Sequence, residues 1–150
     1  MIRMLQKDEE IPYNLLLLAD ETIEAISRYI NDSEIYVFEN DKGTIAVYVL
    51  QKISDDTIEI KNIAVGTEHQ GQGIGKLLLR DAISRAKAKG FKTIVIGTGD
   101  IAPKQLHLYQ KVGFEIFGIK KGFFLDNYPK PIYENGVQLK DMVMLKKELI

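Results

Sequence analysis

The sequence predicts an α/β (α+β) fold in which helices cover one mixed β-sheet. Runs rich in β-branched and apolar residues alternate with runs of helical spacing. The strand-like run Thr57 to Val65, the helical run Ile74 to Lys89 and the short run Thr93 to Ile96 form a strand–helix–strand crossover. The strands before this crossover follow one another through short turns, as antiparallel hairpins do. We therefore expect a sheet of about six or seven strands flanked by about four helices.

The N-terminal half is predicted to hold one strand, two short helices and a hairpin. The helical region from about Pro12 to Ile30 is divided by Asp20, which can cap a second helix that starts at Glu21. The strands are expected over Ile2 to Leu5, Glu34 to Glu39 and Thr44 to Lys52, with a turn over Asn40 to Gly43. Together with the strand that begins at Thr57, the last two form an antiparallel meander.

The C-terminal half is predicted to complete the sheet. Apolar residues recur at helical spacing from Ile74 to Ala86, and Gly90 is placed to end that helix. Pro103 stands where a first helical turn begins, and a short helix follows over Gln105 to Lys111. The segment Gly122 to Gly136, rich in proline, glycine and aromatic residues, is expected to be a long loop. Further strands are expected over Phe114 to Ile119 and Leu139 to Leu145.

Length and composition are those of an ordinary globular protein. The 150 residues suit a single domain, residues 1–150, which buries roughly 68 to 70% of the surface of its unfolded chain. With 45% hydrophobic residues, 27% charged residues and a formal net charge of −1, the chain has no footprint for nucleic acid. The absence of cysteine excludes disulfides, thiolate metal sites and a cysteine nucleophile, and we expect no metal.

No segment has the pattern of a targeting signal or a membrane span. The first residues, MIRMLQKDEE, become acidic before an apolar run develops, unlike a signal peptide. The longest apolar runs, such as Asn14 to Ala19, are far shorter than a membrane span. We therefore expect a cytoplasmic protein without membrane partners, and the lack of cysteine fits a reducing compartment.

A glycine-rich turn stands between the crossover strand and its helix. The stretch from His69 to Lys76 reads HQGQGIGK, and Gly71, Gly73 and Gly75 leave backbone N–H groups with no Cβ beside them. These N–H groups and the positive end of the helix dipole can bind an anion, and a phosphate is the expected ligand.

Two common phosphate-binding templates do not fit this turn. A Walker A loop requires a glycine where Gln70 stands and a serine or threonine where Leu77 stands. A dinucleotide fingerprint requires G-x-G-x-x-G at the opening of the first βαβ unit. Here the run is G-x-G-x-G, and it follows antiparallel hairpins.

The turn resembles the acyl-CoA loop of the GNAT superfamily of N-acetyltransferases, in particular its small single-domain bacterial-type members. The pattern of that loop is Gln or Arg, two residues, Gly, one residue, and Gly or Ala, and Gln70, Gly73 and Gly75 match it. Two further stretches are similar to motifs of the family and stand in the family's order. Asn62 to Val65 is similar to its fourth strand, and Leu106 to Phe114 is similar to its helix with the pattern LY, two residues, GF.

The resemblance implies a GNAT-like fold with a binding site for acetyl-CoA. In that family the fourth strand splays from its parallel neighbour, and its free backbone groups bind the pantetheine arm and the thioester carbonyl as an added strand would. The backbone N–H near Val65 is expected to hold the thioester oxyanion. The residues implied in cofactor binding are Ile63, Ala64, Val65, Gln70, Gly71, Gln72, Gly73, Ile74, Gly75 and Lys76.

The resemblance also implies two catalytic residues. A primary amine with a pKa of about 10.4 must lose a proton before it attacks a thioester. Glu59, five residues before Ala64, is the candidate general base, and the alternative is a solvent-facing strand carboxylate paired with Lys61. Tyr109 matches the general acid that protonates the leaving thiolate, and the alternative is a core aromatic with a satisfied hydroxyl.

Several other residues have two open interpretations. His69, Lys76, Thr98 and Asp100 can either contact the cofactor or be ordinary solvated residues, and His107 is expected to face solvent. The segment Gly122 to Gly136 carries aromatic side chains together with Asp126 and Glu134, which would suit a cationic amine. Its aromatic residues could equally pack against the end of the sheet or form a dimer interface.

We expect an acyl-CoA-dependent N-acyltransferase that transfers acetyl from acetyl-CoA to the primary amine of a small molecule. Direct attack by the amine is expected, since no cysteine can form an acyl-enzyme. The alternatives are a protein N-terminal or lysine acetyltransferase and a non-catalytic acyl-CoA-binding module. Gly97 stands where family members that acetylate protein N-termini often have a glutamate, which disfavours that substrate class. A homodimer is compatible with the sequence.

Overall fold

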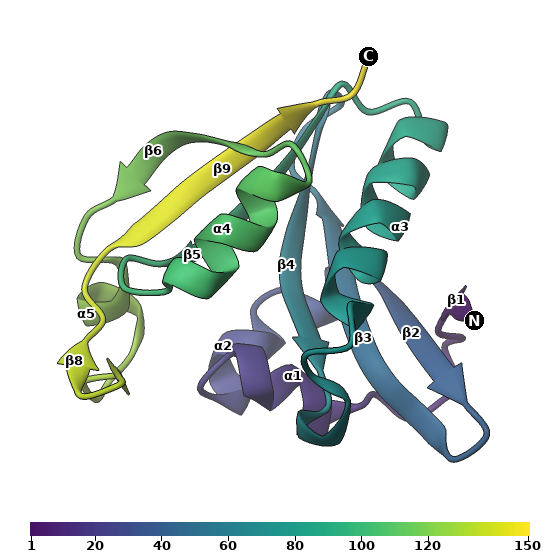
Figure 1. Ribbon diagram of the computed structural model, residues 1–150, viewed down its shortest axis with the longest axis horizontal. Helices are drawn as coiled ribbons and strands as arrows, with labels where there is room; N and C mark the ends of the chain where they lie inside the picture. Colours follow the sequence, from purple (N-terminus) through teal and green to yellow (C-terminus); the bar gives the residue numbers. More distant parts are fainter.

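The computed structural model of the protein describes residues 1–150 and has a seven-stranded mixed sheet at its centre (Figure 1). The strands of this sheet are β1 (Ile2–Met4), β2 (Glu34–Asn40), β3 (Gly43–Lys52), β4 (Thr57–Val65), β5 (Thr93–Gly99), β6 (Glu115–Lys120) and β9 (Met142–Glu148). They lie in the order β1-β2-β3-β4-β5-β9-β6, and every neighbouring pair is antiparallel except β4 with β5. The mixed sheet confirms the predicted fold class.

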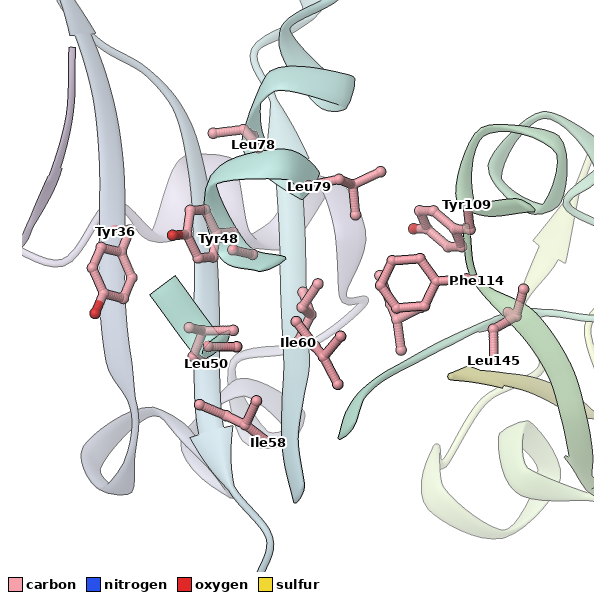
Figure 2. Packing of buried hydrophobic residues seen from close by; sticks show 14 of the residues in the cluster. Tyr36, Tyr48, Leu50, Ile58, Ile60, Leu78, Leu79, Tyr109, Phe114 and Leu145 are labelled. Carbon is pink, nitrogen blue, oxygen red and sulfur yellow. The ribbon is translucent and has the colours of Figure 1, made fainter. Parts of the chain in front are cut away.

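Helices cover both faces of this sheet. They are α1 (Tyr13–Ala19), α2 (Ile23–Ser27), α3 (Ile74–Ala88), α4 (Pro103–Lys111) and α5 (Phe123–Asn127), with 3-10 turns η1 (Ile30–Asp32) and η2 (Thr67–His69). On one face Leu78 and Leu79 of α3 pack with Tyr48 of β3 (Figure 2). On the other face Leu16 of α1 and Ile26 of α2 belong to a second buried cluster. No helix is long and apolar enough to cross a membrane.

A β-bulge in β4 exchanges the two faces of that strand. Ile60 pairs with Leu50 and Asn62 pairs with Val49, so Lys61 is an extra residue with no partner in β3. Such a bulge interrupts the two-residue alternation of side chains. Ile60 therefore packs on the α3 side, whereas the Asn62 amide reaches the backbone of α1.

The parallel pair β4 and β5 separates after four residue pairs. Thr57 to Ile60 are matched with Thr93 to Ile96, and beyond them β5 continues beside β9 up to Gly99 (Figure 1). The segment from Asn62 to Val65 is paired with β3 only, and Lys61 is paired with neither strand. The other edge of this segment therefore presents backbone N–H and C=O groups to the gap between the strands.

The ends of several elements differ from the expectation. Thr22 caps α2, because its side chain accepts a hydrogen bond of 3.0 Å from the Ala25 N–H, so the predicted cap at Asp20 and start at Glu21 are wrong. The final strand begins at Met142 and not at Leu139, whose N–H donates to the Ile132 carbonyl at 2.8 Å and thereby holds the segment outside the sheet.

The predicted long loop from Gly122 to Gly136 is also wrong, because it contains α5 and half of a hairpin. Gly122, with φ of 68°, precedes α5, and its N–H donates to Asp141 at 2.9 Å. The hairpin joins β7 (Tyr133–Glu134) to β8 (Val137–Gln138). Its two turn residues, Asn135 and Gly136, both have positive φ, as a tight hairpin turn requires.

Candidate active site

A cleft of about 870 Å³ opens where β4 and β5 separate. Its walls come from the glycine-rich turn and the start of α3, from α4, from the connection between α1 and α2, and from α5. Segments distant in the sequence therefore meet around the free edge of β4.

The glycine-rich turn presents a row of free donors at one end of the cleft. From Gln70 to Lys76 no backbone N–H donates to another backbone group. Gly71 and Gly73 have φ of 78° and 83°, which favours glycine, whereas Gly75 has helical backbone in the first turn of α3. With the dipole of the 15-residue α3 behind them, these N–H groups are arranged as they would be to bind an anion.

The same turn is tied to the free edge of β4. The side-chain amide of Gln70 donates a hydrogen bond of 2.9 Å to the carbonyl of Val65. An extended ligand can therefore place an anionic group on the turn and continue along Lys61 to Val65 as an added strand. A diphosphate joined to an amide-containing arm, as in CoA, has this shape.

Tyr109 stands on α4 and lines the cleft. Its side chain is buried, and its ring centroid lies 6.3 Å from that of Phe114 (Figure 2). The hydroxyl makes no hydrogen bond to another protein group, in contrast to the satisfied hydroxyl of the alternative interpretation. Burial raises the pKa of Tyr109 to about 12, so the phenol is neutral and available as a proton donor.

Glu59 lies on β4 at the other end of the cleft. Its side chain is only 12% exposed, so it is not the solvent-facing carboxylate of the alternative interpretation. The pairing with Lys61 does occur, since the Lys61 ammonium lies 3.6 Å from the Glu59 carboxylate. The same ammonium lies 5.6 Å from the centroid of the Tyr29 ring. The Lys61 side chain therefore places a primary ammonium between the Glu59 carboxylate and the face of the Tyr29 ring.

Nearly all residues predicted for the site line this cleft. Among the residues implied in catalysis and cofactor binding, the exception is Gln72, which is exposed and lies outside the wall of the cleft. Of the residues with open interpretations, Asp100 and His107 lie outside the wall. Those that line the cleft are Glu59, Ile63, Ala64, Val65, His69, Gln70, Gly71, Gly73, Ile74, Gly75, Lys76, Thr98 and Tyr109.

Sequence reasoning missed a hydrogen-bonded chain beside Glu59. The two oxygens of the Asp20 carboxylate accept hydrogen bonds from the hydroxyls of Tyr128 (2.6 Å) and Tyr29 (3.2 Å). The Tyr29 hydroxyl in turn accepts from the Asn62 amide at 3.1 Å. Burial raises the pKa of both tyrosines above its ordinary value, so both hydroxyls stay protonated. The one available signal was Asn62, a polar residue within an apolar strand.

Aromatic residues of α5 and its end form a wall of the cleft. Phe124 stacks on Tyr128 at 5.9 Å between centroids, and Phe123 meets Phe124 edge-on at 5.2 Å. All three line the cleft together with Glu134, whereas Asp126 is exposed and lies outside it. Only one of the two predicted carboxylates thus joins the aromatic wall.

A splayed strand pair, an anion-binding turn and a buried tyrosine beside the gap define an acyl-CoA-binding transferase. The family model of the acetyltransferase (GNAT) domain matches residues 31–116. The chain belongs to the GNAT family of acetyltransferases, which confirms the predicted resemblance.

Similar proteins agree with this family over nearly the whole chain. An uncharacterized N-acetyltransferase of Bacillus subtilis, YvbK, is 46% identical over 137 residues, which cover 91% of this chain and 88% of that protein. A GNAT family acetyltransferase from Elizabethkingia anophelis with acetyl-CoA bound has a TM-score of 0.97 at 48% identity and covers 99% and 97% of the two chains. A Bacillus subtilis acetyltransferase in complex with CoA has a TM-score of 0.92 at 43% identity and covers 99% and 98%.

The turn can be tested with one glycine substitution. Gly73→Ala is expected to raise the Kd for acetyl-CoA about tenfold, because a left-handed residue with a Cβ costs roughly 1–2 kcal/mol and shifts the donors. Gly90 is a matched control: it follows the other end of α3 with φ of 89°, and a Cβ there would also meet nothing within 4 Å. Gly90→Ala should lower the melting temperature and leave the Kd unchanged in calorimetric titration. An equal rise of Kd in both variants would contradict this role of the turn.

Proposed function

We propose that this N-acetyltransferase transfers the acetyl group of acetyl-CoA to the primary amine of a small molecule by direct attack. The observation that carries the proposal is the cleft itself. It joins the free edge of β4 and the anion-binding turn to a far end with a carboxylate, Glu59, and an aromatic wall. The Lys61 ammonium between Glu59 and Tyr29 supports a substrate with the same charged group.

Glu59 acts as the general base in this proposal. A primary amine with a pKa of about 10.4 is almost entirely protonated at neutral pH, so a proton must leave before its lone pair can attack. The Glu59 carboxylate accepts that proton and releases it to solvent, and it accepts a second proton from the nitrogen as the nitrogen–carbon bond forms. A backbone N–H near Val65 on the free edge of β4 stabilises the negative charge that develops on the carbonyl oxygen.

Tyr109 supplies a proton to the leaving sulfur as the carbon–sulfur bond breaks. Burial that raises the pKa of Tyr109 to about 12 also makes a sulfur anion in the same cleft more basic, because both anions lose hydration. The gap between the pKa of the phenol and that of the thiol therefore widens by less than the full rise at Tyr109. The proton held by Glu59 returns to Tyr109 through solvent, which restores both residues.

The roof of the cleft favours a small acceptor over a protein chain. Besides the bond between Tyr128 and Asp20, the guanidinium of Arg28 on the α2 side donates to the Asn127 carbonyl at 3.1 Å. These bonds connect α5 to the region of α1 and α2 across the aromatic end. A polypeptide would have to break them to reach Glu59.

The test is a measurement of CoA release from purified protein with acetyl-CoA and a panel of primary amines. The proposal expects amine-dependent release and an N-acetylated product identified by mass spectrometry. Tight binding of acetyl-CoA without turnover on any amine would support the non-catalytic module instead. Turnover on peptide N-termini or lysine side chains alone would support a protein acetyltransferase.

We also infer a homodimer formed through the outer edge of β6. Ile116, Phe117 and Ile119 are 50%, 51% and 56% exposed on this edge strand. Antiparallel pairing of two copies about the middle of β6 places Glu115 opposite Lys120 of the second copy.

Sedimentation velocity should therefore show a dimer for the wild type. Glu115→Lys is expected to give a monomer, because it places like charges opposite each other at both ends of the paired strands. The double variant Glu115→Lys, Lys120→Glu should restore the dimer. A monomeric wild type, or a double variant as monomeric as the single one, would contradict this interface.

A further inference from the structure

The only buried side-chain polar atom without a hydrogen-bond partner in the protein is Oδ1 of Asn62. Asn62 is only 5% exposed. An amide oxygen buried without a partner costs free energy, so such an atom in a folded protein calls for an explanation. Asn62 also lines the cleft, one residue before the segment Ile63 to Val65.

The orientation of the Asn62 amide follows from its other contacts. Its nitrogen donates 3.0 Å to the carbonyl of Leu16, which can only accept, so the nitrogen and not the oxygen must face α1. The nitrogen also donates 3.1 Å to the Tyr29 hydroxyl, whose own proton goes to Asp20. Both N–H groups are thus used, and Oδ1 is left to accept from another donor.

The bulge at Lys61 turns the Asn62 side chain to the α1 side of β4. Because the bulge exchanges the faces of the strand, the Asn62 side chain points toward α1 and Tyr29, at the end of the cleft where the Lys61 ammonium pairs with Glu59. Asn62 therefore stands between the candidate base and the strand edge along which the acyl donor binds.

We propose that Asn62 Oδ1 accepts a hydrogen bond from the amino group of the acceptor, an inference that rests on the proposed amine acetylation. A primary amine that has lost one proton to Glu59 keeps two N–H groups and one lone pair. When the lone pair faces the thioester carbon, an N–H is directed away from it and toward the strand. An uncharged amide oxygen holds this N–H without stabilising the unreactive ammonium as strongly as a second carboxylate would.

The hydrogen-bonded residues from Asn62 to Tyr128 give the contact between Asn62 and the amine a fixed geometry. Tyr29 and Tyr128 both donate to Asp20, so the amide of β4, the connection after α1 and the aromatic wall form one hydrogen-bonded unit. The acceptor's apolar part would lie on the aromatic wall while Asn62 orients its nitrogen. The chemical class that fits is a primary amine with an aromatic or other apolar substituent.

The experiment compares wild type and Asn62→Leu with 2-phenylethylamine as the probe. Calorimetric titration of the amine into the enzyme–CoA complex should show binding about tenfold weaker in the variant, and turnover should show a matching loss in kcat/KM. The Kd for acetyl-CoA should not change. The preference of the wild type for 2-phenylethylamine over its N-methyl derivative, which has one N–H fewer, should also shrink in the variant.

Two further variants separate this role from a purely structural one. Tyr48→Phe removes a partly buried hydrogen bond of 2.6 Å from a buried tyrosine to Asp81, outside the cleft, and should lower stability without changing amine binding. Asn62→Ser removes the amide together with Oδ1 and keeps a small polar side chain, so it should lose amine binding as Asn62→Leu does, even if the leucine variant does not fold.

The outcomes distinguish the two proposals. Amine binding and turnover unchanged in Asn62→Ser would overturn the role of Asn62 and leave the proposed function intact. If the wild type binds the amine through Asn62 but does not acetylate it, the proposed function is overturned and the contact with Asn62 stands. A wild type that neither binds nor acetylates the amine would overturn this substrate class and with it the contact.

Discussion

Replacement of Tyr109 by phenylalanine is expected to lower kcat by about 100-fold or more, in line with the usual contribution of a general acid. The ring and its packing on Phe114 stay in place, and only the hydroxyl without a protein partner is lost. The thiolate must then leave unprotonated from a buried site. The measurement is steady-state CoA release, with the Kd for acetyl-CoA determined in parallel and expected to be unchanged.

Tyr36→Phe serves as the matched control. Tyr36 is buried as well, and its hydroxyl donates to Glu34 at 3.0 Å, outside the cleft. Its loss should leave kcat unchanged. An unchanged rate and cofactor affinity in Tyr109→Phe would remove Tyr109 from the mechanism. Because burial raises the pKa of Tyr109 to about 12, the acid form is lost only as pH rises through that value, and no fall in wild-type rate at lower pH should come from this residue.

Glu59→Gln is expected to lower kcat/KM for the amine about 100-fold at pH 7. The substitution keeps the size of the side chain and removes the group that accepts the amine's proton. The reduction in kcat/KM caused by Glu59→Gln should become smaller at higher pH. The fraction of neutral amine rises about tenfold with each pH unit below an amine pKa of about 10.4, so the amine then depends less on a base. A pH–rate profile of both enzymes measures this ratio.

Asp126→Asn is the control for Glu59. Asp126 is an exposed carboxylate on α5 outside the cleft, and its neutralisation should leave kcat/KM unchanged. A loss in Glu59→Gln that stays constant with pH would show that Glu59 binds the ammonium and does not remove its proton. An unchanged kcat/KM at pH 7 would exclude both roles.

The elements with a long and regular apolar pattern were predicted closely from the sequence. β4 occupies Thr57–Val65 as expected, and α3 begins at Ile74 as expected. The run of β4 lies between Asp56 and Gly66, which mark turns, and the 15-residue helical period of α3 leaves little choice of its start. α5 was missed because five residues carry no helical period, and the β7–β8 hairpin was missed although Asn135 and Gly136 are a common turn pair.

The donor side of the proposed site could be predicted from the sequence itself. An anion-binding turn is made by consecutive backbone N–H groups at a helix start, so Gln70 to Lys76 could be predicted as the donor-binding turn without knowledge of the rest of the fold. The adjoining strand could be added because it directly precedes the turn.

The acceptor side was decided only by the tertiary structure. Tyr128 reaches Asp20 across 108 residues, a contact that no local pattern encodes. The bulge at Lys61 reverses the faces of β4, so a simple alternation would have placed Asn62 with Ile60 under α3. Donor binding relies on neighbours along the chain, whereas the groups that would recognise the acceptor converge from separate elements and exist as a site only once the chain has folded.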